Sequence, residues 1–435
     1  MGAPLVVVTA AGLPPGDPLL GSLQAGLAAC PGPLAGPLEL HGARVARQGP
    51  SPAELVHAPL HVHAAGEPSD ILSLLRALAA SGVPLVAADR RQGDPLLVLT
   101  GPAALPNSEP AAAFFDVILV AEPAVVLPGL VEAWTEARDA GPEAVRRAWL
   151  ACRGGYVPAA YRSAYREDGL LQCVEATPGA PLPVPARWDP PAAAPSPDGR
   201  RGPRPMASYL WGWNYDAKDG ARGVSAVLGA ARAPLRLRAG ISLADADLEK
   251  LLGHIAEAGV DQVELEFTLG LPGETDADVD AIVDLIKRLR HRLLRVGRGA
   301  PRTPQIVPAV ATFSPSPWTP TQWAPLADAR DLARRHRDLA RALSKVGNVS
   351  LLHDVPKWAY VQALLARGDR RMERLFRLAL EAGGDWVAAC RNWHLNTDFF
   401  VYRWRRPDEG FPWDHLDVGI SKAALREEAK VRGLL

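Results

Sequence analysis

The four cysteines are the residues whose spacing bears most directly on chemistry. Cys30, Cys152, Cys173 and Cys390 lie far apart in the chain. No two have the short separation of a zinc site or of a redox Cys-x-x-Cys pair. We therefore expect ordinary buried or partly buried thiols and no metal site.

A second group of residues near the C-terminus could carry out acid–base chemistry. His353 and His415 bear imidazoles that titrate near neutral pH, and Asp414 lies directly beside His415. If the C-terminal segment folds back, these residues could act as general acid and base. The alternative is that such groups cap helices and satisfy buried backbone. Neighbouring polar residues that could join the same site are Asp354, His394, Asp398 and Asp417.

His61 and His63 are also close together and could suggest a metal site. Their alternation in a short apolar run instead favours one partly polar face of a strand.

A glycine-rich turn connects a strand to a helix in the second half of the chain. Val263, Leu265 and Phe267 alternate with two glutamates, which is the period-two pattern of a strand with one buried face. The strand ends at residues 270–275, Gly-Leu-Pro-Gly-Glu-Thr, where glycine permits unusual backbone angles. The apolar residues at 279–289 then follow helical spacing. The sequence therefore predicts a strand, a tight turn and a helix.

These residues need elements to hold them, and the first half of the chain predicts an α/β unit. Short apolar runs there are typical of buried parallel strands, and one amphipathic helix lies between two of them. The predicted strands are Leu5–Thr9, Leu60–His63, Pro84–Ala87, Leu96–Leu99 and Asp116–Val120, and the predicted helix is Asp70–Ala80.

The second half predicts further helices and strands after a segment without periodicity. Residues 176–222 are dense in proline, alanine and arginine, which favours an extended linker. Beyond it, we predict a helix at Val224–Ala233 and a strand at Leu235–Leu237. Later elements are a strand at 306–311 and a helix at Leu326–Leu343, so about three strands are predicted between Val224 and Phe313.

Composition limits the classes of partner and compartment. Acidic and basic residues number 48 each, so no overall charge favours nucleic acid or an anionic membrane. No apolar run reaches membrane-spanning length, and the N-terminus lacks a basic segment before its apolar residues. We therefore expect a cytoplasmic protein, and arginine-rich usage suggests a bacterial one.

Several segments resemble, in order and spacing, the second half of a radical S-adenosylmethionine (SAM) barrel. They are the turn at 270–275, the proline- and tryptophan-rich 311–323, the Gly-Asp-Arg-Arg at 368–371 and the segment 412–419. The resemblance covers roughly residues 255–422 and is strongest to the subgroup that has an N-terminal cobalamin-binding-like domain. Residues 101–116 resemble the end of that first domain.

The resemblance implies a fold and a set of cofactors. The fold would be α/β, with a Rossmann-like, cobalamin-binding-type domain at 1–160, a linker at 176–222, a truncated radical-SAM-type (βα) half barrel at 223–345 and a C-terminal extension at 346–435. The family uses SAM, a [4Fe–4S] cluster held by a Cys-x3-Cys-x2-Cys loop, and cobalamin. Ligands sit at the C-terminal mouth of such a barrel. The residues that would bind SAM there are Gly270, Pro272, Gly273 and Glu274.

The sequence departs from the family at the residues that hold the cofactors. No Cys-x3-Cys-x2-Cys loop and no Asp-x-His-x-x-Gly loop occurs, and Ala121 and Pro123 stand where glycines would flank Glu122. We therefore predict a degenerate member without the cluster and with little or no cobalamin binding, which acts as a non-catalytic binding or regulatory homologue. Its partner would be a cluster-bearing paralogue or a second copy, with no nucleic acid or membrane.

Two other functions stay open at this point. One is an active radical SAM enzyme of the cobalamin type. The other is an enzyme with repurposed acid–base chemistry at the barrel mouth.

An open half barrel would also expose an unpaired strand edge and an apolar inner face. The tryptophans of the C-terminal extension carry enough apolar area to cover that face. We expect this cover from Trp386, Trp393, Trp404 and Trp413, or from a partner chain.

Overall fold

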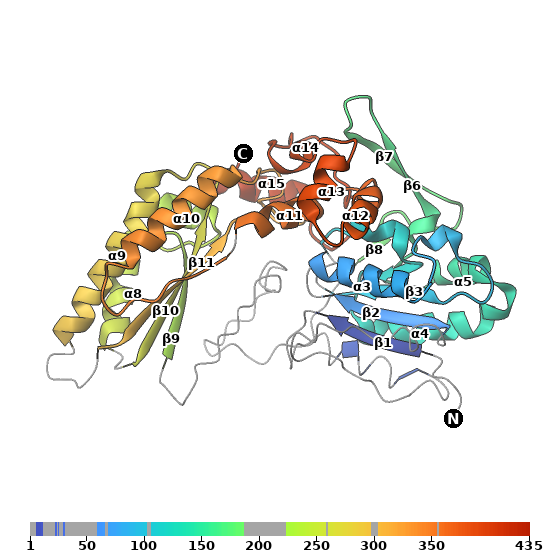
Figure 1. The fold of residues 1–435 in the computed structure, drawn as a ribbon, viewed down its shortest axis with the longest axis horizontal. Coiled ribbons are helices and arrows are strands. Elements are labelled where there is room, and N and C mark those ends of the chain that lie inside the picture. The colour runs from blue at the N-terminus through green and yellow to red at the C-terminus, as the bar shows by residue number, and fades with distance from the viewer. Residues whose placement is uncertain are drawn as a thin grey trace.

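A computed structural model of the chain describes two parallel sheets and a helical C-terminal extension (Figure 1). The described residues are 6–11, 22–23, 25, 29–30, 59–65, 68–101, 106–186, 223–257, 260–296, 303–354 and 356–435. Most of the predicted linker, residues 187–222, lies outside them. The fold is therefore mixed α/β with parallel sheets.

The first sheet contains five strands in chain order. They are β1 (Val6–Ala11), β2 (Leu60–Ala65), β3 (Leu96–Thr100), β4 (Val117–Leu119) and β5 (Gly155–Tyr156). The first four are parallel, and β5 is antiparallel to β4. A Rossmann sheet reverses its strand order at a switch point. The described strands run in chain order, so the finer Rossmann assignment is not confirmed.

Helices cover both faces of the first sheet, as the runs of apolar residues in its strands require. Leu97 and Leu99 of β3 pack into the core that contains α3 (Pro68–Ala80), whereas Leu96 and Val98 pack with α4 (Pro123–Ala137). The helix α5 (Pro142–Trp149) follows α4. His61 and His63 of β2 are both buried, and their rings lie 5.7 Å apart.

The strand predicted at Pro84–Ala87 is wrong. The backbone there makes a bend that leads into a 3-10 turn, η1 (Ala87–Asp89). The guanidinium of Arg90 donates to the carbonyls of Pro84 (3.1 Å) and Leu85 (2.9 Å). Because these carbonyls bind a side chain, they are not available to a neighbouring strand.

A buried ion triad fastens the first sheet to its flanking segments. Asp116 lies between Arg90 (2.5 Å) and Arg146 (2.7 Å), and it also accepts a hydrogen bond from the backbone N–H of Leu97 (2.8 Å). Both lone-pair-bearing oxygens of the carboxylate are therefore used, as a buried charge requires.

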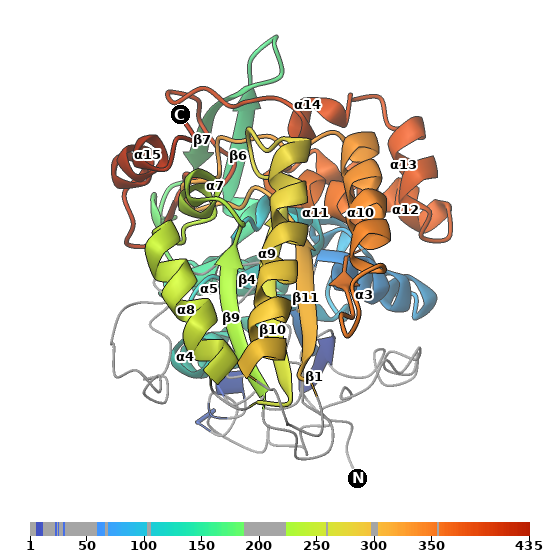
Figure 2. The ribbon, with the colours of Figure 1, turned by 90° about the vertical axis from the view of Figure 1, so that its left-hand side faces the viewer.

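The second sheet is parallel and has four strands in the order β12-β11-β10-β9. The strands are β9 (Gly223–Gly229), β10 (Gln262–Leu269), β11 (Gln305–Thr312) and β12 (Leu352–His353). The helices α8 (Asp245–Glu257), α9 (Asp276–Val296) and α10 (Ala329–Leu343) lie on the same face of this sheet (Figure 2). Alternating strand and helix place all four carboxyl ends at one edge, which we call the carboxyl edge.

Two predicted elements near the start of this sheet are wrong. The segment predicted as a helix at Val224–Ala233 contains β9, and the predicted strand at Leu235–Leu237 lies in the helix α7 (Ala233–Arg238). β9 pairs with β10, and Pro234 stands in the first turn of α7, where a missing N–H costs nothing. The pairing of β9 with β10 and the position of Pro234 therefore give a strand followed by a helix, where a helix followed by a strand was predicted.

The C-terminal extension packs mainly against the first sheet. Its helices are α11 (Pro356–Arg367), α12 (Met372–Glu381), α13 (Trp386–Asn392), α14 (Asp398–Val401) and α15 (Lys422–Val431), and they lie between the two sheets (Figure 1). The short strand β13 (Leu416–Asp417) pairs with β8 (Val184–Pro185), and β6 (Tyr161–Tyr165) forms a hairpin with β7 (Leu171–Ala176).

The tryptophans predicted to cover the inner face of the second sheet pack elsewhere, and cover by a partner chain stays a prediction. Trp386, Trp393 and Trp413 are buried in one core with residues of the first sheet and of the loop after β11, and Trp404 is 50 % exposed. The core between the second sheet and its helices is separate. The extension therefore covers the first sheet and the carboxyl edge of the second.

No helix in the described part of the chain is both long enough and apolar enough to span a bilayer.

Candidate functional site

The glycine-rich turn forms part of the carboxyl edge, directly after β10. Gly270 (φ 90°) and Gly273 (φ 76°) both have left-handed backbone angles, which favour glycine. The carboxylate of Glu274 accepts a hydrogen bond from the N–H of Gly270 (2.7 Å), which closes the turn. Arg335 of α10 binds the Glu274 carboxylate (3.2 Å) and its carbonyl (3.0 Å).

The four residues predicted to bind SAM meet in this turn, and their groups already contact the protein. Arg238 donates to the carbonyl of Pro272 (2.7 Å). A side chain at Gly270 would lie 2.6 Å from Leu332. The turn is therefore braced by α7 and α10, and SAM binding stays a prediction.

Glu274 has an unusual charge state because it is buried. Glu274 is 8 % exposed, and burial raises the pKa of its carboxyl to about 7. The hydrogen bond from Gly270 and the charge of Arg335 oppose that shift. The group therefore titrates near neutral pH.

A second polar cluster lies at the same edge, at the ends of β11 and β12. The hydroxyl of Thr312 is 3.2 Å from Nε2 of His336, which comes from α10. The N–H of Thr312 donates to Asp354 (2.6 Å), and Nδ1 of His353 lies 2.8 Å from the Asp354 carbonyl oxygen. The rings of His336 and His353 are 5.4 Å apart. We call Thr312, His336, His353 and Asp354 the edge cluster.

Burial keeps His336 in its neutral form. The residue is 4 % exposed, and burial, followed by the nearby His353, lowers the pKa of its imidazole to about 4. Its Nδ1 has no hydrogen-bond partner among the described residues. A neutral imidazole that contacts a hydroxyl can accept its proton, so the edge cluster has the elements of a general base.

His336 was not predicted as a site residue from the sequence. It lies on the buried face of α10, with Leu332, Leu339 and Leu343. A histidine at helical spacing among leucines was the available signal.

His415 lies elsewhere, between the first sheet and the extension. It is buried, 3.8 Å from the carboxylate of Glu109, and its ring is 4.9 Å from that of Tyr156. Arg370 of the extension binds both carboxylate oxygens of Glu109 (3.1 Å each). Burial lowers the pKa of His415, and the charge of Glu109 opposes the shift.

Asp414 holds together neighbouring parts of the C-terminal extension. Its carboxylate binds Lys422 (2.5 Å) and accepts a hydrogen bond from the N–H of Phe411 (2.8 Å). His353 belongs to the edge cluster, whereas His415 lies beside Glu109 and Tyr156. The structure thus places the three predicted acid–base residues in different surroundings.

The cysteines lie on separate elements and do not match the donor set of an iron–sulfur cluster. Cys173 is on β7, Cys390 is on α13 and Cys152 follows α5. Burial raises the pKa of Cys30, Cys152 and Cys390, which disfavours the thiolate that binds iron. Within the described residues, no three His, Cys, Asp or Glu side chains gather as a metal ion would require.

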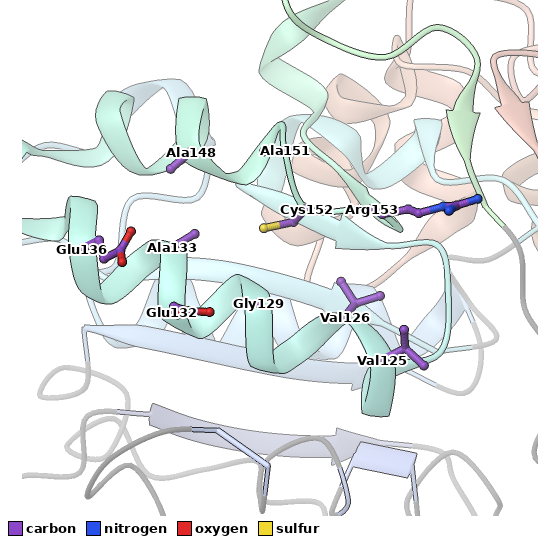
Figure 3. A pocket seen from close by; sticks show the side chains of 10 residues that line it. All are labelled: Val125, Val126, Gly129, Glu132, Ala133, Glu136, Ala148, Ala151, Cys152 and Arg153. Atoms are coloured by element: carbon purple, nitrogen blue, oxygen red, sulfur yellow. The ribbon is translucent and has the colours of Figure 1, made fainter.

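A surface hollow of about 480 Å³ lies away from these clusters, on the helices α4 and α5 (Figure 3). Small residues line much of it, among them Gly129, Ala133 and Ala148, together with the carboxylates of Glu132 and Glu136. None of the predicted site residues lines this hollow.

Comparison with known proteins gives one family match. Residues 67–158 match the family model described as "Radical SAM proteins, N-terminal". This segment runs from α3 to the end of the first sheet and includes Glu109 and Tyr156. No curated protein matches the chain. The match supports a relationship of the first unit to radical SAM proteins.

Proposed function

We propose that this chain is a radical-SAM-like protein that has lost its [4Fe–4S] site and acts as a binding or regulatory homologue. The family match over residues 67–158 and the resemblance of the turn at 270–275 support the relationship. In this proposal, residues 1–160 form a cobalamin-binding-type domain, 176–222 a linker, 223–345 a (βα) half barrel and 346–435 the extension.

The observation that carries the proposal is the placement of the thiols. A [4Fe–4S] cluster needs close thiolates, and in this family it also supplies the electron that cleaves SAM. Cys173 and Cys390 lie on different elements, and Cys30 and Cys152 have raised thiol pKa values. This chain's own residues therefore support neither the binding of a cluster nor the transfer of an electron to SAM.

Binding at the carboxyl edge is the activity that this arrangement retains. The turn from Gly270 to Glu274 lies at the edge where ligands of parallel α/β sheets bind. SAM is the proposed ligand. The proposed protein partner is a cluster-bearing paralogue or a second copy, which could pair with the edge strand β9.

Anaerobic purification with iron and sulfide analysis tests this proposal. We expect far less than one iron per chain after reconstitution and no broad charge-transfer band. About four irons per chain, with a band that bleaches on reduction, would restore the radical enzyme. SAM binding is measured separately by calorimetry on the same preparation.

Cobalamin binding is expected to be weak or absent. Pro123 begins α4, and Ala121 already lies against Gly154, where an added Cβ would be 2.7 Å from the Ala121 side chain. Ala121 and Pro123 replace the glycines that would give the backbone room for a corrin tail beside Glu122. Titration with hydroxocobalamin should leave its visible spectrum unchanged, and a sub-micromolar complex would contradict this.

A second candidate function is acid–base catalysis at the edge cluster. The observation in its favour is the contact of neutral His336 with the hydroxyl of Thr312. A screen of ester and phosphoester substrates with wild type and His336→Gln would test it. Turnover that falls at least tenfold in His336→Gln, while His415→Gln keeps it, would favour this enzyme over the binding protein.

A further inference from the structure

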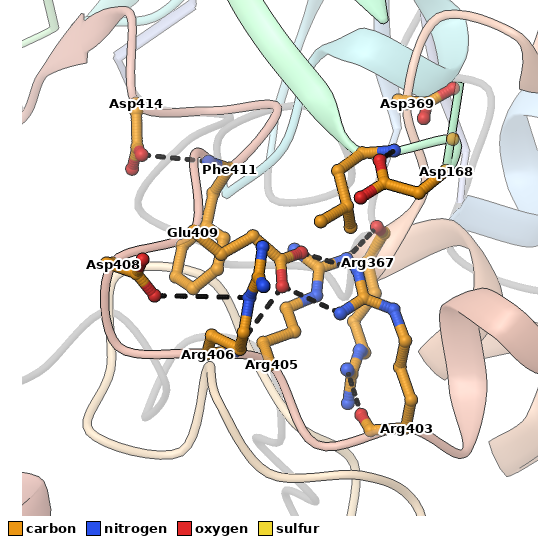
Figure 4. Close-up of polar contacts among 12 residues, drawn as sticks. Asp168, Arg367, Asp369, Arg403, Arg405, Arg406, Asp408, Glu409, Phe411 and Asp414 are labelled. Atoms are coloured by element: carbon orange, nitrogen blue, oxygen red, sulfur yellow. Dashed lines mark hydrogen bonds and ion pairs between the residues drawn. The ribbon is translucent and has the colours of Figure 1, made fainter. Parts of the chain in front are cut away.

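Three arginines of the C-terminal extension gather around one carboxylate in the protein interior. Arg367 ends α11, and Arg403 and Arg405 follow α14 in the chain. Arg403 binds Glu409 through both terminal nitrogens, one at 2.7 Å. Figure 4 shows Arg403 reaching the carboxylate of Glu409, with Arg405 and Arg367 beside it. We call these four residues the arginine cluster.

The other two arginines bind backbone carbonyls rather than carboxylates. Arg367 donates to the carbonyls of Ala324 and of Arg403 (2.7 Å). Arg405 donates through Nη2 to the carbonyl of Arg367, at the C-terminal end of α11. The bond to Ala324 joins the extension to the loop after β11, and the other two lie within the extension. The carbonyls supply only partial negative charge.

The arginine cluster therefore holds more positive than negative charge. Nearby carboxylates are engaged elsewhere, since Asp369 binds Arg371 (2.6 Å) and Asp414 binds Lys422 (2.5 Å). Arg367 and Arg405 are 1 % and 4 % exposed. Glu409 is thus paired with Arg403, which is partly exposed, and the buried guanidinium groups of Arg367 and Arg405 lie nearby without a carboxylate partner of their own.

Donor groups in the arginine cluster are also left without acceptors. Nε and Nη1 of Arg405, and Nε of Arg367, make no hydrogen bond to any described residue. Burial lowers the pKa of Arg405 to about 10, and the neighbouring Arg403 adds to that shift. Buried donors and excess charge of this kind call for an ion.

Aromatic contacts account for part of this arrangement. The guanidinium of Arg405 lies 5.0 Å from the ring centroids of both Phe411 and Trp413. A cation–π contact of this kind attracts positive charge, but it supplies neither a hydrogen-bond acceptor nor a counter-charge for Arg367.

We propose that the arginine cluster binds a small oxyanion of the phosphate class between Arg367 and Arg405. Guanidinium groups are the donors best matched to phosphate and carboxylate oxygens. The bound anion would neutralise the excess charge and hold the extension against the loop after β11. This inference is independent of the proposed function.

Equilibrium dialysis of the wild-type chain against inorganic phosphate, in an anion-poor buffer, tests the site directly. We expect saturable binding of one phosphate per chain. The midpoint of thermal unfolding should also rise with phosphate more than with sodium chloride of equal ionic strength. Absence of saturable binding at millimolar phosphate would overturn the proposal, whatever the variants do.

Variants separate the site from the general effect of phosphate on stability, which acts by exclusion from the surface. Arg405→Met removes the charge, and Arg405→Lys keeps it without the planar fork. We expect the first to abolish binding and the second to weaken it about tenfold. Arg406→Gln is the control, because Arg406 is exposed and pairs with Asp408 on the same loop (4.0 Å). Wild-type affinity in Arg405→Lys, or loss of binding in Arg406→Gln, would place the ion elsewhere and overturn the assignment.

Discussion

Burial sets the charge state of single residues at the carboxyl edge. It raises the pKa of Glu274 to about 7 and lowers that of His336 to about 4. Both shifts favour the neutral form, because a low-dielectric surrounding penalises charge of either sign. The edge therefore holds a carboxyl that titrates near neutral pH and an imidazole that is uncharged there.

The shift at Glu274 predicts a pH dependence of stability. Its folded pKa of about 7 lies above the ordinary value of 4.5, so the folded chain binds the proton more tightly than the unfolded chain. The stability that this proton contributes is present below pH 4.5 and is lost as pH rises through 7. Wild type should lose up to about 3 kcal/mol over that range relative to Glu274→Gln.

Urea unfolding at several pH values from 5 to 8 measures this difference. Glu257→Gln is the matched control, because Glu257 is exposed at the end of α8. Parallel pH profiles for wild type and Glu274→Gln would show that the carboxyl of Glu274 has an ordinary pKa.

Residues of the candidate site were predictable from sequence only where local pattern marks them. The turn residues Gly270 and Glu274 stood at a strand–helix junction, and the structure brings them together. His336 was marked only by its helical spacing among leucines and Arg405 by nothing local, because their partners, Thr312 and the carbonyl of Arg367, are distant in sequence. Burial by tertiary packing gives them their chemistry, and sequence spacing does not contain it.

At the scale of elements, the strongest local signals predicted β10 and α9 correctly. The alternation from Val263 to Phe267 and the helical spacing after Asp276 agree with both elements. Prediction failed at Pro84–Ala87, where the side chain of Arg90 binds the backbone carbonyls. It also failed at Val224–Leu237, where the backbone of β9 pairs with β10. Local propensity is a weak guide wherever such long-range hydrogen bonds decide the structure.

The turn between these elements predicts the effect of an added methyl group. Gly273 has a φ of 76°, and a Cβ there would meet the guanidinium of Arg238, which binds the Pro272 carbonyl. Gly273→Ala should therefore cost about 1–2 kcal/mol of unfolding free energy, measured in urea. Gly253→Ala is the control, because Gly253 lies within α8 with open space around it.

The control should change stability in the opposite direction. Replacing glycine by alanine inside a helix stabilises by about 0.5–1 kcal/mol. Equal effects of the two substitutions would contradict the strained turn at Gly273.

At the scale of the whole molecule, the C-terminal extension joins the two sheets. Its buried tryptophans share a core with the first sheet, while Trp318 and Trp323 enter that core from the loop after β11. The bidentate pair of Arg370 with Glu109 adds a charged contact between the extension and the first unit. Tryptophan content indicated an apolar cover, but which sheet it covers depends on the path of the chain.

This arrangement predicts that Trp413 supports the fold far more than Trp404 does. Trp413 is fully buried, donates through Nε1 to Gln322 of the loop after β11 (3.1 Å) and packs on Phe411. Trp413→Ala should therefore lower the free energy of unfolding by about 3–5 kcal/mol, since it leaves a cavity and removes one of the hydrogen bonds to Gln322. Trp404→Ala removes a half-exposed ring and should cost about 0.5 kcal/mol or less. Urea unfolding followed by circular dichroism compares the two, and equal losses would show that the extension does not join the sheets through this core.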